Sequence, residues 1–564
     1  MRSMPLATLI VTGLFLGMTA QAAAQRDTLS LRPAFRLIDR YAAQMMQSAN
    51  TPGLSLALVD RTGVITVRSY GYADIGRRIP ITPATRFEIG SISKSFTAIA
   101  LLQLRDEGKF DPSRPVRSYL PWFTPASRWR PVTSHDLLTH TAGLPADRDD
   151  IPSSRAQAYL ARERTLGSAP GTRWAYSNIG FQVMGVVLET LTKQRYPDII
   201  RSRILEPLGM TGAAAEFTHE TRRRLAVGYL PLYDDRPARP DDPLVEGTWI
   251  EYGSGDGAIV ANSTELGAYL TMLLNRGEGP HGRVLSEAGY TSLMTPHARI
   301  ARDGDHYGYG MFLGTLDERP VFYHSGGMLG YTSYLIGVPS LGIGAVAFVN
   351  GPGDPDDVAR FALQALAAAS SGDSLPNLPP SSPPAHVDDP ARFVGRFLAP
   401  NGDSLVFAAS GDSLFLVRGD RRDLLLRAGE TSFLGPVPDF GLYPIRFGPT
   451  SGGVTEVWYG GAWYVSEQYT GPRRFVTPKE WRAYEGNYRI MQPWEPDFRI
   501  VLRKGQLWWI GPDGDEQPLT PTGPRTFRVG EAGSAEVLQF ADVVDGHALR
   551  ATLSGMAYYR YFTP

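Results

Sequence analysis

The chain of 564 residues contains no cysteine, which excludes both disulfides and thiolate metal sites. It also lacks an excess of charge, since 56 basic and 57 acidic side chains leave a net charge of −1. This balance offers no basic face for nucleic acid and no polybasic patch for a membrane surface. The nine histidines show no H-E-x-x-H or comparable spacing. We therefore expect no metal and no other cofactor.

The N-terminal segment "MRSMPLATLIVTGLFLGMTAQAAAQ" carries one arginine, a short apolar stretch and small residues around Ala22 to Ala24. This pattern predicts a secretory signal peptide over residues 1–24, and hence a periplasmic or secreted protein. An uncleaved membrane anchor is the alternative, but a spanning helix needs about 20 apolar residues. No later stretch is long and apolar enough to span, so we expect no membrane-spanning segment after cleavage.

A proline-rich stretch, "SSGDSLPNLPPSSPPAHVDDP", interrupts the amphipathic pattern and predicts an extended linker over residues 371–390. Before this linker, two strands around a tight turn are predicted twice, in "GLSLALVDRTGVITVRSYGYAD" and in "GYTSYLIGVPSLGIGAVAFVN". Helical patterns flank these pairs, and hairpins at both ends suggest one antiparallel sheet closed by strands distant in sequence. The fold class expected for residues 25–370 is therefore α+β, a sheet layered with helices.

After the linker the pattern changes to short alternating strands with glycine and aspartate turns. Phe393-x-Gly395-x-Phe397 recurs as Tyr484-x-Gly486-x-Tyr488, which indicates a tandem all-β repeat. Two small barrels or sandwiches are expected over residues 391–476 and 477–564. Their aromatic side chains, including Trp508, Trp509, Tyr558 and Tyr559, are predicted to fill the interiors rather than to bind a ligand.

The stretch "RFEIGSISKSFTAIALLQLRDEG" places Ser91 three residues before Lys94, at the start of a run that is apolar on almost every side. Such a run predicts a helix buried within the domain. Two residues three apart lie on one helix face, and burial together with the positive end of the helix dipole favours a neutral amine at Lys94. A neutral lysine can take the proton of a serine hydroxyl. The alternative is that Ser91 only caps the helix while Lys94 extends outward.

Two further short motifs follow in the same region. "PGTRWAYSNIGFQVMGVVLE" contains Tyr176-Ser177-Asn178, and "VFYHSGGMLGYTSYLIGVP" contains His324-Ser325-Gly326, followed by Gly327. Together with S-x-x-K, these motifs resemble the active site of the serine β-lactamase and penicillin-binding-protein superfamily. The resemblance covers residues 30 to 370, including "LLTHTAGLP" and "LEPLGMTG". It is strongest to the class C β-lactamases and the related esterases and D-aminopeptidases, and the C-terminal repeats resemble lipocalin-like β-barrels.

The resemblance implies a fold and a set of roles. It implies a β-lactamase/transpeptidase-like domain with Ser91 as nucleophile and with Lys94 and Tyr176 exchanging protons. Asn178 would bind substrate or orient Lys94, while Ser325, Gly326 and Gly327 would line the substrate strand. The N–H groups of Ser91 and Gly327 would form the oxyanion hole.

His324 stands where the penicillin-recognising members have lysine. A histidine is mostly neutral at pH 7 unless a carboxylate raises its pKa, so the attraction for a substrate carboxylate is weakened. This favours the esterase and D-aminopeptidase branch, in which histidine occupies the position. His140 in "LLTHTAGLP" is interpreted only as a helix or turn residue.

The predicted function is that of an exported serine hydrolase that cleaves an ester or amide through an acyl-enzyme on Ser91. The expected partner is a small ester, amide or peptide, for example one derived from the cell wall, and nucleic acid is not expected as a partner. A β-lactamase or DD-carboxypeptidase is the first alternative, and a non-catalytic sensor of peptidoglycan fragments is the second. A GDSL-type esterase is disfavoured, because "GDSL" occurs three times, at residues 372, 402 and 411, in places explained by turns. The sequence does not choose the substrate or the oligomeric state.

Overall fold

The computed structural model describes residues 30–146, 153–300, 304–379, 384–449 and 453–561. The predicted signal peptide at residues 1–24 lies outside the described residues, as does part of the predicted linker. Within the described ranges, no helix combines the length and the apolar character needed to cross a membrane.

The N-terminal region is built on one nine-stranded sheet in the order β10-β11-β12-β13-β14-β15-β1-β2-β3. Both predicted hairpins are present, and β1 from the first pairs antiparallel with β15 from the second, as predicted. The strands of this sheet are β1 (Gly53–Asp60), β2 (Gly63–Asp74), β3 (Ile79–Pro80), β10 (Ala298–Arg299), β11 (His306–Tyr307), β12 (Phe312–Leu316), β13 (Arg319–Met328), β14 (Tyr331–Val338) and β15 (Ile343–Val349).

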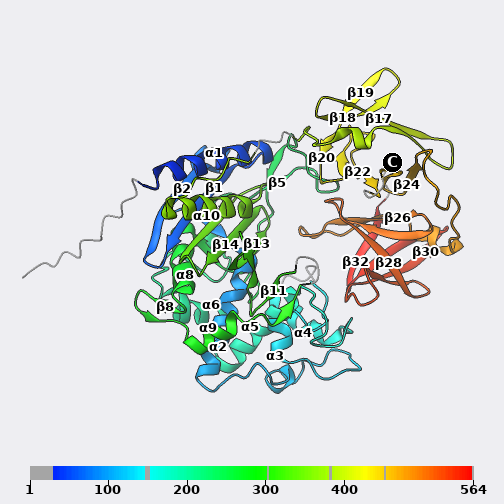
Figure 1. Cartoon of the computed structure of the whole chain (residues 1–564). Helices are drawn as coiled ribbons and strands as arrows, with labels where there is room; N and C mark the ends of the chain where they lie inside the picture. Colours follow the sequence, from blue (N-terminus) through cyan, green and yellow to red (C-terminus); the bar gives the residue numbers. More distant parts are fainter. Residues whose placement is uncertain (1–29, 147–152, 301–303, 380–383, 450–452, 562–564) are drawn as a thin grey trace, which may run out of the picture.

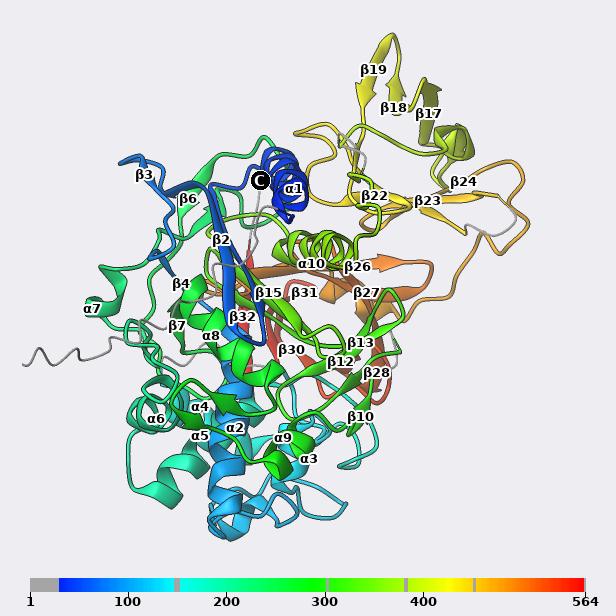
Figure 2. The same cartoon turned by 60° about the vertical axis from the view of Figure 1, so that its left-hand side comes forward.

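Helices cover both faces of the sheet, which gives three layers (Figure 1). On one face, α1 (Arg32–Ala49) and α10 (Pro355–Ser371) pack on Leu54, Leu56 and Leu58, the alternate side chains of β1. On the other face lie α8 and the helical region around α2, as Figure 2 shows from the side. The remaining helices are α2 (Ser93–Asp106), α3 (Ser134–Leu138), α4 (Ser154–Leu160), α5 (Asn178–Thr192), α6 (Tyr196–Ile200), α7 (His219–Arg222), α8 (Ser263–Leu274) and α9 (Glu287–Leu293).

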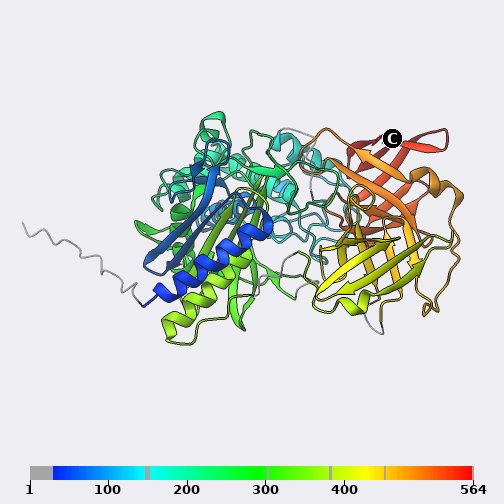
Figure 3. The same cartoon turned by 90° about the horizontal axis from the view of Figure 1, so that it is seen from above.

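Two all-β units follow and lie side by side (Figure 3). The second unit is a closed barrel. The first is a nearly closed nine-stranded sheet, and its two end strands, β19 and β20, are separated in sequence only by the buried Leu425. The α+β domain followed by β-barrels is therefore confirmed. The strands of the first unit are β16 (Gly395–Leu398), β17 (Ser404–Ser410), β18 (Ser413–Arg418), β19 (Arg421–Leu424), β20 (Leu426–Arg427), β21 (Ser432–Leu434), β22 (Pro444–Gly448), β23 (Glu456–Tyr459) and β24 (Ala462–Val465). Those of the second are β25 (Gly486–Arg489), β26 (Asp497–Arg503), β27 (Gln506–Ile510), β28 (Glu516–Gly523), β29 (Thr526–Val529), β30 (Val537–Val544), β31 (His547–Leu553) and β32 (Met556–Tyr561).

The sequence repeat corresponds to a structural repeat. In each unit a short 3₁₀ turn, Pro390–Phe393 or Lys479–Tyr484, leads into the first strand through a glycine. Gly395 and Gly486 have φ values of 151° and 154°, a backbone region that other residues rarely adopt. The same backbone feature therefore starts both units.

The prediction that aromatic residues fill the barrel is confirmed for Tyr558 and wrong for Tyr559. Tyr558 is fully buried in the core of the second barrel, whereas Tyr559 is 58% exposed. Trp509 packs against this core, but Trp508 lies outside it, 4.6 Å from the guanidinium carbon of Arg503. Successive residues of a strand point to opposite faces, so only one member of each aromatic pair can face inward.

The three "GDSL" strings start at turns or at a helix end. Gly372 is the left-handed C-cap of α10, and Gly402 and Gly411 have positive φ just before β17 and β18. Local backbone conformation therefore explains all three.

Candidate active site

Ser91 lies in a 3₁₀ turn, Gly90–Ile92, that joins the short strand β4 (Arg86–Glu88) to α2. The sequence predicts Ser91 in the first turn of the helix, but α2 begins two residues later. Gly90 has a φ of 51°, and a Cβ added to it would lie 2.7 Å from the carbonyl oxygen of Gly327. The turn therefore sits directly against β13, which brings Ser91 beside Gly327.

Lys94 lies beneath Ser91 and is fully buried in α2. Its Nζ is 2.9 Å from Ser91 Oγ and 2.8 Å from the carbonyl oxygen of Asp256. The same Nζ is 4.9 Å from the centroid of the Tyr176 ring. The structure thus brings Ser91, Lys94 and Tyr176 together around one amine.

Asp256 holds the lysine from the other side, and sequence reasoning missed it. Its carboxylate accepts hydrogen bonds from the Tyr252 hydroxyl, at 2.7 and 2.8 Å, and from Gln182 Nε2 at 3.2 Å. These bonds fix the peptide whose carbonyl faces Lys94. No short motif marks this residue, because its role depends on a carbonyl direction that only the fold sets.

Tyr176 and Asn178 are held by the start of α5. The Ser177 side chain caps this helix by accepting from Gly180 N–H, and its hydroxyl donates to the carbonyl of Pro145 at 2.7 Å. Asn178 is the first residue of α5, and the ring of Tyr176 lies 4.3 Å from that of His140. The helix N-terminus therefore fixes the direction of both predicted site residues.

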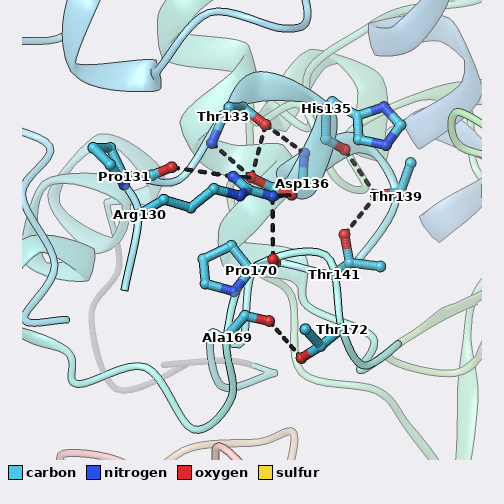
Figure 4. A network of polar contacts seen from close by, with 10 residues as sticks. All are labelled: Arg130, Pro131, Thr133, His135, Asp136, Thr139, Thr141, Ala169, Pro170 and Thr172. Carbon is cyan, nitrogen blue, oxygen red and sulfur yellow. Dashed lines mark hydrogen bonds and ion pairs between the residues drawn. The ribbon is translucent and has the colours of Figure 1, made fainter. Parts of the chain in front are cut away.

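An ion pair between the half-exposed Arg130 and the buried Asp136 anchors the loop that precedes Tyr176 (Figure 4). Arg130 donates to both carboxylate oxygens of Asp136, at 2.6 and 2.7 Å, and to the carbonyl of Pro170 at 3.1 Å. Burial raises the pKa of Asp136, but hydrogen bonds from Arg130 and Thr133 outweigh it and hold that pKa below its usual range. The ionised carboxylate thus ties the turn at Pro170 and Gly171 to α3.

His140 and His324 belong to one buried chain of hydrogen bonds. Ser177 N–H donates to His140 Nδ1 at 3.1 Å, so the ring proton of a neutral His140 lies on Nε2, 3.2 Å from Tyr307 Oη. The Tyr307 hydroxyl then donates to His324 Nε2 at 3.0 Å, and His324 Nδ1–H donates to the carbonyl of Ser325 at 2.6 Å. Each donor thus has one acceptor, and this series of hydrogen bonds links the Tyr176 loop to β13.

Both histidines of this chain are held in the neutral form. Burial lowers the pKa of His324 to about 3 and that of His140 well below its ordinary value, and any charge on Lys94 acts in the same direction. His140 does occupy a turn, with a φ of 55°, but its ring is a central part of the site. The family-like string "LLTHTAGLP" around His140 was the signal in the sequence that could have indicated a role in the site, whereas the contacts of the ring could not be predicted.

Alternate residues of β13 face opposite sides at the site. His324 and Gly326 are buried, whereas Ser325 and Gly327 are exposed. A Cβ at Gly326 would lie 2.0 Å from the carbonyl oxygen of Ile89, but one at Gly327 would meet nothing within 4 Å. Glycine is therefore required at 326 by packing, and the strand is open toward solvent at 327.

Ser91 opens into a cavity of about 1180 Å³. Of the predicted site residues, Ser91, Asn178 and Gly327 line it, whereas Lys94 and His324 are buried behind it. Trp249–Tyr252 lines one side and the second barrel lines another. Among the described residues, no group of three or more histidine or acidic side chains is placed to hold a metal ion.

One family is identified by comparison with known proteins. A family model described as Beta-lactamase matches residues 38–369. Protein flp of Staphylococcus aureus (strain NCTC 8325 / PS 47) is 25% identical over 323 residues, which is 56% of this chain and 62% of the relative. Unguisins hydrolase ungD' of Aspergillus campestris (strain IBT 28561) is 30% identical over 338 residues, 54% of this chain and 60% of the relative. The chain thus covers about three fifths of the length of these relatives.

A solved structure gives the same fold. The octameric penicillin-binding protein homologue from Pyrococcus abyssi superposes with a TM-score of 0.56 at 24% sequence identity. The match covers 77% of this chain and 100% of the other. At this identity the likeness concerns the fold alone.

Proposed function

The chain belongs to the beta-lactamase family, and from that premise we propose that it is an exported serine hydrolase that cleaves an ester or amide through an acyl-enzyme on Ser91. The observation that carries the proposal is the 2.9 Å distance between Ser91 Oγ and the Nζ of the buried Lys94. A hydroxyl at this distance from an amine with no access to solvent can transfer its proton as it attacks a carbonyl.

The proposed mechanism uses these residues as follows. Ser91 loses its proton to Lys94, assisted by Tyr176, and its oxygen bonds to the substrate carbonyl carbon. The N–H groups of Ser91 and Gly327 stabilise the oxyanion, and such donors contribute about 3 to 4 kcal/mol each. Tyr176 returns the proton to the departing alcohol or amine. Water, activated by the same pair, then releases the acyl group and restores Ser91.

His324 bears on the choice of substrate. Its pKa of about 3 and its hydrogen bonds to Tyr307 and Ser325 keep it neutral at pH 7, so it supplies no positive charge for a substrate carboxylate. This supports an esterase or D-aminopeptidase-like activity over a β-lactamase or DD-carboxypeptidase. The similarity to a relative named unguisins hydrolase also supports a hydrolase.

The competing function is a binding protein that senses cell-wall fragments without turnover. In such a protein, Ser91 would have no need of a buried amine within hydrogen-bond distance. We also propose a periplasmic or secreted location from the N-terminal sequence, and no nucleic-acid partner from the balanced charge.

A fluorophosphonate probe followed by intact mass separates the two functions. We expect one adduct on the native chain and none on Ser91→Ala, with both proteins showing the same far-UV circular dichroism. No adduct on the native chain, or equal labelling of both, would overturn the enzyme proposal. A panel of one chromogenic ester, one D-alanyl anilide and one cephalosporin then ranks the substrates, and fastest turnover of the cephalosporin would contradict the argument from His324.

A further inference from the structure

The second β-barrel supplies one wall of the cavity into which Ser91 opens. This wall comes from Arg489–Trp494, the end of β25 with the loop after it, and from Tyr559–Tyr561 at the end of β32. A barrel that served only as a spacer would present polar side chains here. Met491 is instead 98% exposed, and Tyr559 and Tyr561 are 58% and 50% exposed. Single exposed apolar residues are common, but three on one wall of a catalytic cavity indicate a binding surface.

The wall on the side of Ser91 is also largely apolar. Trp249, Ile250, Tyr252 and Met328, from the N-terminal region, line it together with Glu251 and Asp256. The Asp256 carboxylate accepts hydrogen bonds from Tyr252 and Gln182, and Glu251 lies 3.4 Å from His219. Aromatic rings offer large, rigid apolar faces, and methionine adapts its shape to what it contacts. An apolar group placed between the two walls would therefore be covered on both sides.

The charged side chains of the barrel wall are already engaged. Arg489 forms ion pairs with Asp234 and with Asp497, the latter at 3.3 Å. Arg560 lies against the barrel, where its guanidinium donates to the carbonyl of Ala483 at 3.5 Å. This wall is therefore better suited to an uncharged group than to an anionic one.

The size of the cavity adds a second constraint. Its volume of about 1180 Å³ exceeds the roughly 300–1,000 Å³ of most small-molecule sites. A short acyl group on Ser91 would leave most of this space filled with water. A large apolar group would displace that water and bury its own surface.

We propose that the substrate carries a large apolar group, on the acyl or on the leaving side, which lies between Trp249 and Tyr252 on one wall and Met491, Tyr559 and Tyr561 on the other. The proposal rests on the proposed hydrolase function of Ser91 and names its substrate class. The second barrel is then a determinant of specificity. In this proposal the N-terminal region carries out the chemistry at Ser91, and the second barrel determines which esters or amides bind productively beside Ser91.

The test measures kcat/KM of the full-length protein for two series of esters. One series lengthens the acyl chain of p-nitrophenyl esters from acetyl to decanoyl, and the other pairs an acetyl group with alcohols of increasing apolar size. At least one series is expected to gain tenfold or more from its smallest to its largest member. The series that gains tells which side of the scissile bond faces the barrel.

Variants of exposed residues assign the gain to the barrel wall. In the double variant Met491→Ser and Tyr559→Thr, the gain in kcat/KM from the smallest to the largest ester is expected to fall about tenfold. Val476→Ser is the matched control, because Val476 is 96% exposed and lies outside the cavity lining. It is expected to keep the full gain.

Failure of this inference is distinguishable from failure of the proposed function. If Ser91 reacts with a small fluorophosphonate but neither series gains with size, the enzyme proposal stands and the substrate class is wrong. A gain that the double variant leaves intact would also overturn the assignment to the barrel. If Ser91 does not react at all, the hydrolase function itself is refuted.

Discussion

The close packing of the Ser91 turn on β13 predicts a large effect from one added methyl group. In Gly326→Ala the new Cβ would lie 2.0 Å from the carbonyl oxygen of Ile89 and 2.5 Å from Ser333 Oγ, whereas ordinary contact begins at 3.4 Å. The turn and the strand must therefore separate by more than about 1 Å, and a displacement of that size at a reacting group can cost about 10²-fold in rate. The strain also lowers the free energy of unfolding by about 1–3 kcal/mol.

The assay is the second-order rate of fluorophosphonate labelling of Ser91, together with the midpoint of thermal unfolding. Gly327→Ala is the matched comparison, because its Cβ meets nothing within 4 Å and its backbone N–H is kept. We expect Gly326→Ala to label about 100-fold more slowly than the native protein and to unfold at a lower temperature. Gly327→Ala should keep the native midpoint. Equal labelling rates and equal midpoints for the two variants would refute the view that contact with β13 positions Ser91.

Three further predictions concern buried polar groups. Lys94→Met should slow labelling of Ser91 by 10²-fold or more, since general-base assistance is worth about 10²–10⁴, without lowering the thermal midpoint; rapid labelling would exclude Lys94 as the base. The pKa of His324 is about 3 when folded and about 6.5 when unfolded, so only the unfolded state takes up this proton as pH falls below 6.5. The free energy of unfolding should therefore fall as the pH drops from 6.5 to about 3, by about 2 kcal/mol between pH 7 and pH 5. Urea titrations of His324→Gln should show a correspondingly smaller loss over the same pH range. Equal losses in the native protein and the variant would contradict the assigned pKa. Arg130→Met should lower the free energy of unfolding by about 2 kcal/mol in the same titrations, because it leaves the buried carboxylate of Asp136 without its partner. The loss is smaller than for a fully buried pair, since the Arg130 side chain is 49% exposed. An unchanged free energy of unfolding would mean that water replaces Arg130.

Short patterns with a local physical cause could be predicted from the sequence. Turn residues placed both hairpins, and the presence of a hairpin at each end led to the pairing of β1 with β15. The motifs that contain Ser91, Lys94 and Tyr176 named side chains that the fold brings together. Each turn and each motif is set by residues close together in the chain, even where the elements that they mark are distant from one another.

Features that depend on distant contacts could not be predicted. Asp256 holds Lys94 through a carbonyl, and Tyr307 joins His140 to His324, so neither residue has a local pattern. The sequence also did not determine which alternate residues of each barrel strand face the interior, here called the phase of the strand. Adjacent aromatic residues such as Tyr558 and Tyr559 fit equally well facing in or out. The barrel wall of the cavity follows from that phase and from how the barrel sits against the N-terminal region.

The division of the cavity between two regions has a consequence for biosynthesis. Ser91 and Lys94 are made early, whereas Tyr559 and Tyr561 belong to the last strand and leave the ribosome hundreds of residues later. Under the proposed function, a nascent chain can therefore assemble a reactive serine before the barrel wall is present to favour substrates with a large apolar group. Under the proposed substrate class, selection by the barrel begins only when β32 closes it, so damage to this strand would leave a hydrolase without that preference rather than an inert protein.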